Sequence, residues 1–352
     1  MSVLDLLRPE IRELVPYQPA SSDIDALRLN ANETPWREIG DKTHRGLNRY
    51  PPARPTELAT RLAARYGVEP EQILVTRGSS EAIDLIVRST CRTGKDNILV
   101  LTPGFAMYGV YAKVQGAGGK QLALSEADGF RLDAEALLAT IDTNTRAVFL
   151  CSPNNPTGNA FDREAINAVV AGLANRAMVV IDEAYREFSD QDCVDLLEYP
   201  HVALLRTLSK AYGLAGIRCG ALLTHPRLIG ALGAVLPPYN LPTPCIELAM
   251  ASLDPEADSA AEERIRLLRS ERARLARALA DLPGVERVFP SDANFLLVRV
   301  VDATDWDQAL QRQGILVRRF DGDPSLDGCL RITVGRPEDN DRLLEILAKG
   351  GG

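Results

Sequence analysis

The feature that most constrains the fold is an alternation of short apolar runs with longer amphipathic segments, which begins near residue 97. The runs have the length of strands, whereas residues 163–174 carry apolar side chains at helical spacing. Buried strands separated by helices predict a parallel α/β sheet, because parallel strands need crossover connections that cover the faces of the sheet. The expected strands are residues 98–101, 147–150, 178–181, 203–205 and 221–223.

The last third of the chain predicts a second, smaller unit. Four prolines between residues 237 and 244 indicate a boundary. Residues 260–281 then predict a long surface helix, with apolar residues on one face and Arg and Glu on the other. Further strands at 294–301, 315–318 and 329–334, with helices at 305–313 and 337–348, predict a small α+β domain.

Composition narrows the class of function. The 352 residues carry a formal net charge of -8, which argues against nucleic acid or an anionic membrane as the main partner and favours small-molecule substrates. Six dispersed cysteines without a C-x-x-C pair predict reduced thiols, no metal site and a cytoplasmic location. The first residues lack the pattern of a signal peptide, and no apolar run is long enough to span a bilayer.

Residues 206–218 place one lysine among hydroxyl groups, glycines and a second cation. The amine of Lys210 can form a Schiff base with the aldehyde of pyridoxal phosphate. Thr207, Ser209 and Arg218 are donor types that bind a phosphate. The alternative interpretation is a solvated lysine beside a glycine-rich turn.

A carboxylate follows the predicted strand 178–181. Asp182 stands where that strand delivers it to the carboxyl edge of the sheet, and a buried charge there needs a cationic partner such as a protonated pyridine nitrogen. A structural aspartate that caps a loop is the alternative. Tyr185, three residues on, can donate a hydrogen bond to a ring oxygen of the cofactor.

Three further segments carry candidate ligand-binding residues. The turn at 152–158 can aim the amide of Asn155 at a ligand, although turn chemistry alone explains most such strings. Ser79 and Ser80 precede a helical pattern, so they are either phosphate ligands at a helix N-terminus or plain N-caps. Phe105 follows a strand and can stack on an aromatic ring or belong to the core.

Taken together, these segments resemble the pyridoxal-phosphate aminotransferases of the aspartate aminotransferase fold, in the same order along nearly the whole chain. The resemblance implies an α/β fold of type I, with a large, mostly parallel sheet flanked by helices and a smaller α+β domain. It divides the chain into an N-terminal segment 1–28 that packs with the small domain, a large cofactor-binding domain 29–245 and a small domain 246–352.

The same resemblance implies roles for single residues. Lys210, Asp182 and Tyr185 are the expected catalytic residues, with Lys210 bound to the cofactor's aldehyde carbon and Asp182 paired with its ring nitrogen. Asn155 and Tyr185 are expected to contact the ring oxygen and Phe105 to stack on the ring. The expected phosphate ligands are Ser79, Ser80, Thr207, Ser209 and Arg218.

A narrower resemblance, to the histidinol-phosphate aminotransferase subfamily, rests on residues 15–17, 29–33, 48–51, 290–295, 314–318 and 329–335. It implies that Tyr17, Tyr50, Asn155, Arg318 and Arg331 bind the substrate. It also implies a homodimer in which Tyr50 reaches the neighbouring active site. The doublet of Arg318 and Arg319 leaves open which guanidinium faces the substrate.

The function implied by this resemblance is a transamination in histidine biosynthesis. L-Histidinol phosphate and 2-oxoglutarate would give imidazole-acetol phosphate and L-glutamate by a ping-pong route. An aromatic amino acid aminotransferase and a decarboxylase of threonine phosphate are the rival enzymes, because these folds share most motifs. A cofactor-sensing regulator is a third rival, but the motifs begin by Tyr17 and leave no room for a preceding DNA-binding domain.

Overall fold

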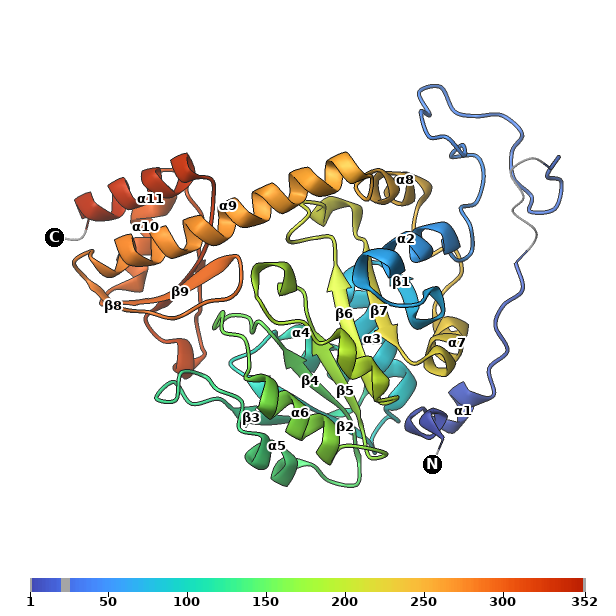
Figure 1. Cartoon of the computed structure of the whole chain (residues 1–352), viewed down its shortest axis with the longest axis horizontal. Helices are drawn as coiled ribbons and strands as arrows, with labels where there is room; N and C mark the ends of the chain where they lie inside the picture. Colours follow the sequence, from blue (N-terminus) through green and yellow to red (C-terminus); the bar gives the residue numbers. More distant parts are fainter. Residues whose placement is uncertain (1, 20–25, 351–352) are drawn as a thin grey trace.

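A seven-stranded sheet forms the centre of the large part of the molecule (Figure 1). The computed structural model describes residues 2–19 and 26–350. The strand order is β1-β7-β6-β5-β4-β2-β3. The bounds are β1 Ile73–Thr76, β2 Asn97–Thr102, β3 Gly118–Ala123, β4 Thr145–Cys151, β5 Met178–Asp182, β6 Val202–Thr207 and β7 Gly220–Thr224.

The sheet is mostly parallel, as the sequence predicts. Strands β2 to β6 run parallel to one another, and all five apolar runs expected here are strands. The prediction of a parallel arrangement is wrong for β7, which is antiparallel to both β6 and β1. Residues 208–219 join β6 to β7 without an α-helix, and so short a connection returns the chain in the opposite direction.

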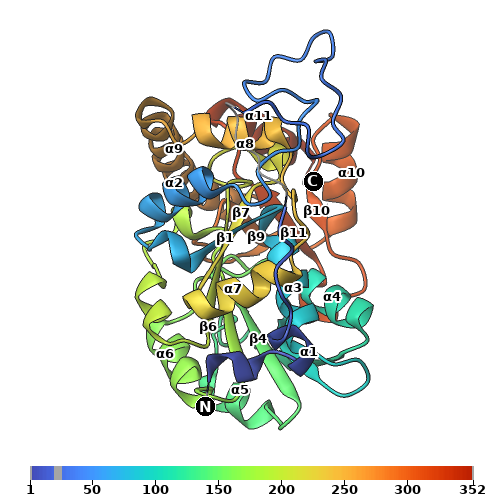
Figure 2. The ribbon, with the colours of Figure 1, turned by 90° about the vertical axis from the view of Figure 1, so that its right-hand side faces the viewer.

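Helices cover both faces of this sheet. Their bounds are α1 Pro9–Arg12, α2 Thr56–Tyr66, α3 Gly78–Thr90, α4 Met107–Gln115, α5 Ala134–Thr140, α6 Arg163–Gly172, α7 Pro226–Val235 and α8 Thr243–Ala251. Figure 2 shows α6 on one side of the sheet and α3 with α4 on the other. Helix α3 contacts β6 and β7, and Ile83, Ile86 and Val87 on it are fully buried. The apolar periodicity seen in the sequence is therefore the core-facing side of α3.

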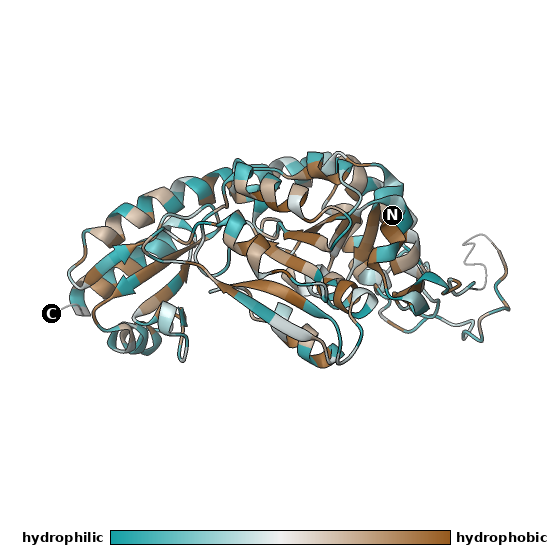
Figure 3. Cartoon of the chain, turned by 90° about the horizontal axis from the view of Figure 1, so that it is seen from below, coloured by the Kyte–Doolittle hydropathy of each residue, from teal (hydrophilic) through white to brown (hydrophobic). Residues whose placement is uncertain are grey.

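A four-stranded antiparallel sheet forms the small domain, in the order β10-β11-β9-β8. Helix α9 contacts the short 3-10 helix η3 beside the large sheet and also β8 and β9, so it joins the two parts (Figure 1). In Figure 3 the strands are mainly hydrophobic, whereas α9 alternates hydrophilic and hydrophobic turns. The bounds are η3 Arg186–Phe188, α9 Pro255–Ala280, β8 Val285–Val288, β9 Phe295–Val300, α10 Ala303–Arg312, β10 Arg318–Arg319, β11 Cys329–Thr333 and α11 Pro337–Gly350.

The start of the chain packs differently from the expectation. The 3-10 helix η1 (Val3–Leu6) and α1 contact α7, and Leu6, Leu7 and Ile11 belong to the core of the large part. Packing of the N-terminal segment with the small domain is therefore wrong for these residues, because their apolar side chains are buried against α7. Residues 1 and 20–25 of that segment lie outside the described residues.

Two other expectations concern the domain boundary and the membrane. The division between residues 245 and 246 falls inside α8, a helix that contacts α2, and it stays a prediction. In the described part of the chain, no helix has the length and apolarity needed to cross a membrane. All six cysteines are free, and Cys245 is the one that is not fully buried.

Candidate active site

A cavity of about 590 Å³ lies at the carboxyl edge of the large sheet, closed on one side by residues of the small domain. Strands β4, β5 and β6 are parallel neighbours; Cys151 and Asp182 are the last residues of β4 and β5, and Asp182 stands in register with Leu205 of β6. The polar residues that follow these strands therefore converge on one place. The lining residues are Ser79, Ser80, Gly104, Phe105, Ala106, Cys151, Asn155, Pro156, Asp182, Ala184, Tyr185, Thr207, Ser209, Lys210, Arg218, Arg318, Phe320, Asp323, Leu326 and Arg331.

Asp182 is the buried carboxylate of this cavity. The phenol of Tyr108 donates a hydrogen bond to its Oδ2 at 2.8 Å, and the backbone N–H of Ala184 donates to its Oδ1 at 3.1 Å. Burial raises the pKa of Asp182 to about 6, although both hydrogen bonds act in the opposite direction. An ionised group that is this poorly solvated gains from a cationic partner in the cavity.

Lys210 supplies an amine to the same cavity. Its Nζ lies 5.7 Å from the centroid of the Tyr185 ring. Loss of solvation lowers the pKa of Lys210, the positive charge of Arg331 lowers it further, and Asp182 acts in the opposite direction. A lowered pKa increases the fraction of neutral amine, which is the nucleophilic and proton-accepting form.

One end of the cavity is built to bind an anion. Ser79 and Ser80 lie in the first turn of α3, whose free N–H groups favour negative charge. Arg218 approaches this turn so closely that a Cβ on Gly78, which has a φ of +70°, would stand 2.8 Å from the guanidinium. Among the described residues, no carboxylate forms an ion pair with Arg218, so its charge is available to a ligand.

Hydroxyl groups complete this end of the cavity. Thr207 donates a hydrogen bond to the hydroxyl of Ser209 at 3.0 Å, and Arg218 donates to the same Ser209 oxygen at 3.4 Å. The donor set of two helix-terminal serines, two further hydroxyls and a guanidinium fits a phosphate ester.

Three polar residues of the cavity are linked to one another by hydrogen bonds. Asn155 donates from Nδ2 to the phenol oxygen of Tyr185 at 3.3 Å, and its Oδ1 accepts a hydrogen bond from Arg331. Burial raises the pKa of Tyr185 well above its ordinary value, so the phenol keeps its proton as a donor. Phe105 also lines the cavity and meets the edge of Tyr108, with ring centroids 5.5 Å apart.

Two guanidinium groups enter the cavity from the small domain. Arg318 and Arg331 are cross-strand partners of β10 and β11, and each guanidinium lies 5.9 Å from the centroid of Phe320. Burial lowers the pKa of Arg331, and the charge of Arg318 adds to this effect. Neither arginine forms an ion pair within the described part of the chain. Two neighbouring positive charges that are not neutralised by an ion pair form a site for an anion.

The strand geometry shows which arginine of the doublet, Arg318 or Arg319, faces the cavity. Adjacent residues of a strand point to opposite faces, so only one of the two can face the cavity. Arg318 lines it, whereas Arg319 binds the hydroxyl of Thr304 at 2.7 Å and forms an ion pair with Asp321.

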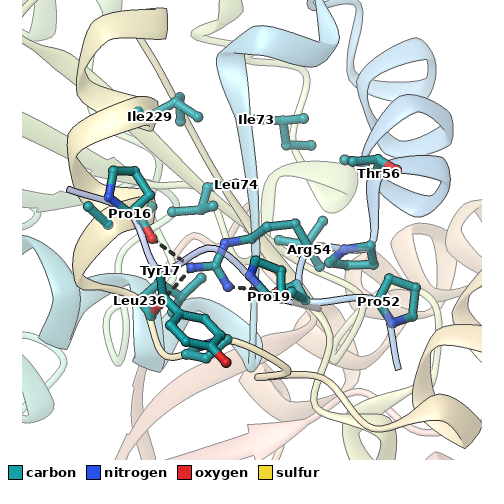
Figure 4. A pocket seen from close by; sticks show the side chains of 18 of the residues that line it. Pro16, Tyr17, Pro19, Pro52, Arg54, Thr56, Ile73, Leu74, Ile229 and Leu236 are labelled. Atoms are coloured by element: carbon teal, nitrogen blue, oxygen red, sulfur yellow. Dashed lines mark hydrogen bonds between the residues drawn. The ribbon is translucent and has the colours of Figure 1, made fainter. Parts of the chain in front are cut away.

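Two of the predicted substrate residues lie outside this cavity. Tyr50 stacks on Tyr239, with ring centroids 4.8 Å apart. Tyr17 lines another cavity of about 850 Å³, together with Arg54, Leu74 and Leu236 (Figure 4). Within a single chain, neither tyrosine reaches Lys210, and their expected roles stay predictions.

The structure also shows residues in and behind the cavity wall that sequence reasoning missed. Tyr108 was not singled out; it is buried and acts on the site through the hydrogen bond that its phenol donates to Asp182. Phe320, Asp323 and Leu326 come from the irregular segment between β10 and β11, where no periodic pattern marks them.

Comparisons with known proteins agree with this geometry. The histidinol-phosphate aminotransferase of Xylella fastidiosa strain 9a5c is 46% identical over 352 residues, which cover 98% of this chain and 96% of that relative. The crystal structure of the histidinol-phosphate aminotransferase from Clostridium acetobutylicum has a TM-score of 0.78 at 25% identity, over 86% of this chain and 90% of that one.

A further solved structure contains the cofactor expected from the sequence. It is the histidinol-phosphate aminotransferase of Sinorhizobium meliloti in complex with pyridoxal-5'-phosphate, with a TM-score of 0.77 at 26% identity, over 86% of this chain and 82% of that one. The sequence profile described as "Aminotransferase class I and II" matches residues 19–347 of this chain. Fold, site and sequence therefore agree, and the chain belongs to the class I and II aminotransferases.

Proposed function

We propose that this chain transfers the amino group of L-histidinol phosphate to 2-oxoglutarate, and thereby forms imidazole-acetol phosphate and L-glutamate in histidine biosynthesis. The observation that carries the proposal is the pair Arg318 and Arg331: both guanidiniums lie in the cavity of Lys210, and neither forms an ion pair with a carboxylate of the described residues. A guanidinium binds a phosphate ester and a carboxylate equally well in geometry, so one site serves both substrates. Relatives named histidinol-phosphate aminotransferase, at 41% to 46% identity, support the same reaction.

The cavity fits pyridoxal phosphate as the cofactor. Arg218, Ser79, Ser80, Thr207 and Ser209 would hold its phosphate, and the buried Asp182 would hold the proton on its ring nitrogen. Asn155 and Tyr185 would bind its ring oxygen, and Phe105 would cover its ring. When bound, the cofactor supplies an electrophilic carbon and an acceptor for the electron pair of the substrate's broken C–H bond.

Lys210 and the two cavity arginines have different roles in the proposed reaction. Lys210 would hold the cofactor in the resting enzyme and would move the α-proton of the substrate as a general base and acid. Its lowered pKa raises the fraction of neutral amine, which is the form that this role requires. Arg331 and Arg318 bind the anionic end of the substrate and so orient its α-carbon.

We infer that the working enzyme is a homodimer in which Tyr50 completes the neighbouring active site. The segment that holds Tyr50 exposes several large apolar side chains, among them Trp36 at 78% and Ile39 at 97%. A second copy of the chain would cover such a surface. The cytoplasm is the proposed location, since six free cysteines suit a reducing compartment.

Mixing two inactive variants tests the contribution of Tyr50. In a hybrid of Lys210→Ala and Tyr50→Ala chains, the site that keeps its lysine receives Tyr50 from the other chain. Turnover should therefore reappear after the two variants are unfolded and refolded together. If Tyr50 acts within its own chain, no hybrid site is complete and the mixture stays inactive.

Formation of glutamate tests the reaction itself. Purified enzyme with pyridoxal phosphate should produce glutamate only when L-histidinol phosphate and 2-oxoglutarate are both present. Arg331→Lys keeps the charge but loses the planar pair of donors, so the KM for both substrates should rise. Glutamate formation that is equally fast with phenylalanine, or carbon dioxide release from threonine phosphate, would assign the chain to one of the rival activities.

A further inference from the structure

The proposed amino donor carries an imidazole ring, and the groups described so far leave that ring without a partner. Arg318 and Arg331 account for the anionic end of the donor, and Lys210 accounts for the reacting carbon. The remaining wall of the cavity comes from the segment between β10 and β11, which contributes Phe320, Asp323 and Leu326. This wall is where a ring that extends from the α-carbon can find contacts.

Asp323 is a half-buried carboxylate in this wall. Its Oδ1 accepts hydrogen bonds from the backbone N–H and the hydroxyl of Ser325, at 3.0 and 2.6 Å, which fix the side chain at the start of the 3-10 helix η6 (Pro324–Leu326). Its Oδ2 has no hydrogen-bond or ion-pair partner among residues 2–19 and 26–350. One oxygen of a fixed carboxylate is therefore available to a molecule in the cavity.

The nearby cations do not use this oxygen. Arg318 and Arg331 line the same cavity, but neither forms an ion pair with Asp323 within the described ranges, and Arg319 pairs with Asp321 instead. Both cavity arginines lie against the ring of Phe320, so the anion site and the wall that holds Asp323 adjoin each other.

We propose that Asp323 determines the choice of amino donor by accepting a hydrogen bond from the imidazole N–H, while Phe320 and Leu326 pack against the ring. The inference rests on the proposed function, since it assigns a group to the ring of that donor. A phenyl ring has no N–H, so phenylalanine would strip water from this oxygen and leave it unpaired. A buried polar group without a partner is costly, and sites built to bind a substrate N–H reject analogues that lack it.

A purely structural role for Asp323 predicts a different outcome. As the N-cap of η6, the side chain would affect every substrate through the shape of the loop. Serine is an equally good N-cap, so Asp323→Ser keeps the cap and removes the second carboxylate oxygen, which makes no contact with Ser325. Asp321→Ser is the matched control, because it removes one negative charge from an exposed position of the same segment.

The experiment follows the visible band of the bound cofactor in single half-reactions. For Asp323→Ser, the concentration of L-histidinol phosphate that gives half the maximal rate should rise about tenfold or more, the usual cost of a lost charged hydrogen bond. The concentration of glutamate that gives half the maximal rate should not rise, because glutamate has no ring N–H. Asp321→Ser should change the half-maximal concentration of neither substrate. The preference for L-histidinol phosphate over phenylalanine should fall by a similar factor.

Two results would overturn the inference. If the half-maximal concentration rises equally for L-histidinol phosphate and glutamate, Asp323 acts only through the shape of the loop. If it changes for neither of these two donors, Asp323 makes no contact with the ring. Failure of the proposed function looks different, because the unaltered enzyme itself would then not react with L-histidinol phosphate.

Discussion

The close approach of Arg218 to Gly78 in the proposed phosphate site makes Gly78→Ala the most informative substitution. Gly78 has a φ of +70°, and an added Cβ would stand 2.8 Å from Nη2 of Arg218. The left-handed backbone alone costs about 1–2 kcal/mol for a residue with a Cβ. The contact in addition pushes the guanidinium away from the first turn of α3, where it would bind the cofactor's phosphate.

The size of the effect follows from the hydrogen bonds at stake. A charged hydrogen bond contributes about 1.5–3 kcal/mol, so displacement of Arg218 should weaken pyridoxal phosphate binding about 10-fold to 150-fold. Gly67→Ala is the matched control, since Gly67 has a φ of +69° but nothing lies within 4 Å of the added Cβ. Both variants should lose similar stability, and only Gly78→Ala should lose cofactor affinity.

Fluorescence titration of the apoprotein with pyridoxal phosphate, together with urea unfolding, measures both quantities. Unchanged cofactor affinity in Gly78→Ala would refute the assignment of the phosphate site. An equal loss of affinity in Gly67→Ala would show that backbone strain alone is responsible.

Three further predictions concern the charged groups. Because the pKa of Asp182 is raised to about 6, its carboxyl is neutral and unable to pair with a cation at lower pH; cofactor affinity should therefore rise as pH increases through 6, and a titration of Asp182→Asn should lack this step. Arg206→Ala leaves the buried Glu183 without its ion-pair partner, so the free energy of unfolding measured in urea should fall by about 3–5 kcal/mol. The exposed Arg336→Ala should lower it by less than about 1 kcal/mol. Lys210→Ala should abolish turnover and still bind pyridoxal phosphate, as absorbance after gel filtration can show.

Strands and helices with strong apolar patterns are the part of the fold that sequence reasoning predicts. The run 178–181 is buried on both faces, and it appears as β5 with Asp182 at its end. By contrast, β3 is a partly exposed edge strand of mixed polarity, so it has no pattern to detect. The strand predicted at 315–318 is wrong for residues 315–317, because β10 consists only of Arg318 and Arg319. The direction of β7 depends on the connection before it rather than on its own residues.

Some residues of the candidate site could likewise be predicted from the sequence, and others could not. Lys210, Asp182, Asn155 and Arg218 stand next to strand ends or turns with a chemical signature, and all four line one cavity. Tyr108 escaped notice because its function is visible only through its contact with Asp182, 74 residues away. Sequence spacing does not report such long-range contacts. The location of the first helices likewise depends on burial of Leu6, Leu7 and Ile11 against α7, which no local motif encodes.

The central claim is best tested by the visible spectrum of the cofactor-loaded enzyme. L-Histidinol phosphate, phenylalanine or threonine phosphate would each be added alone, without a keto acid. The account predicts that the visible band is lost fastest with L-histidinol phosphate and returns when 2-oxoglutarate is added. Fastest loss with phenylalanine, or no change with any donor, would contradict it.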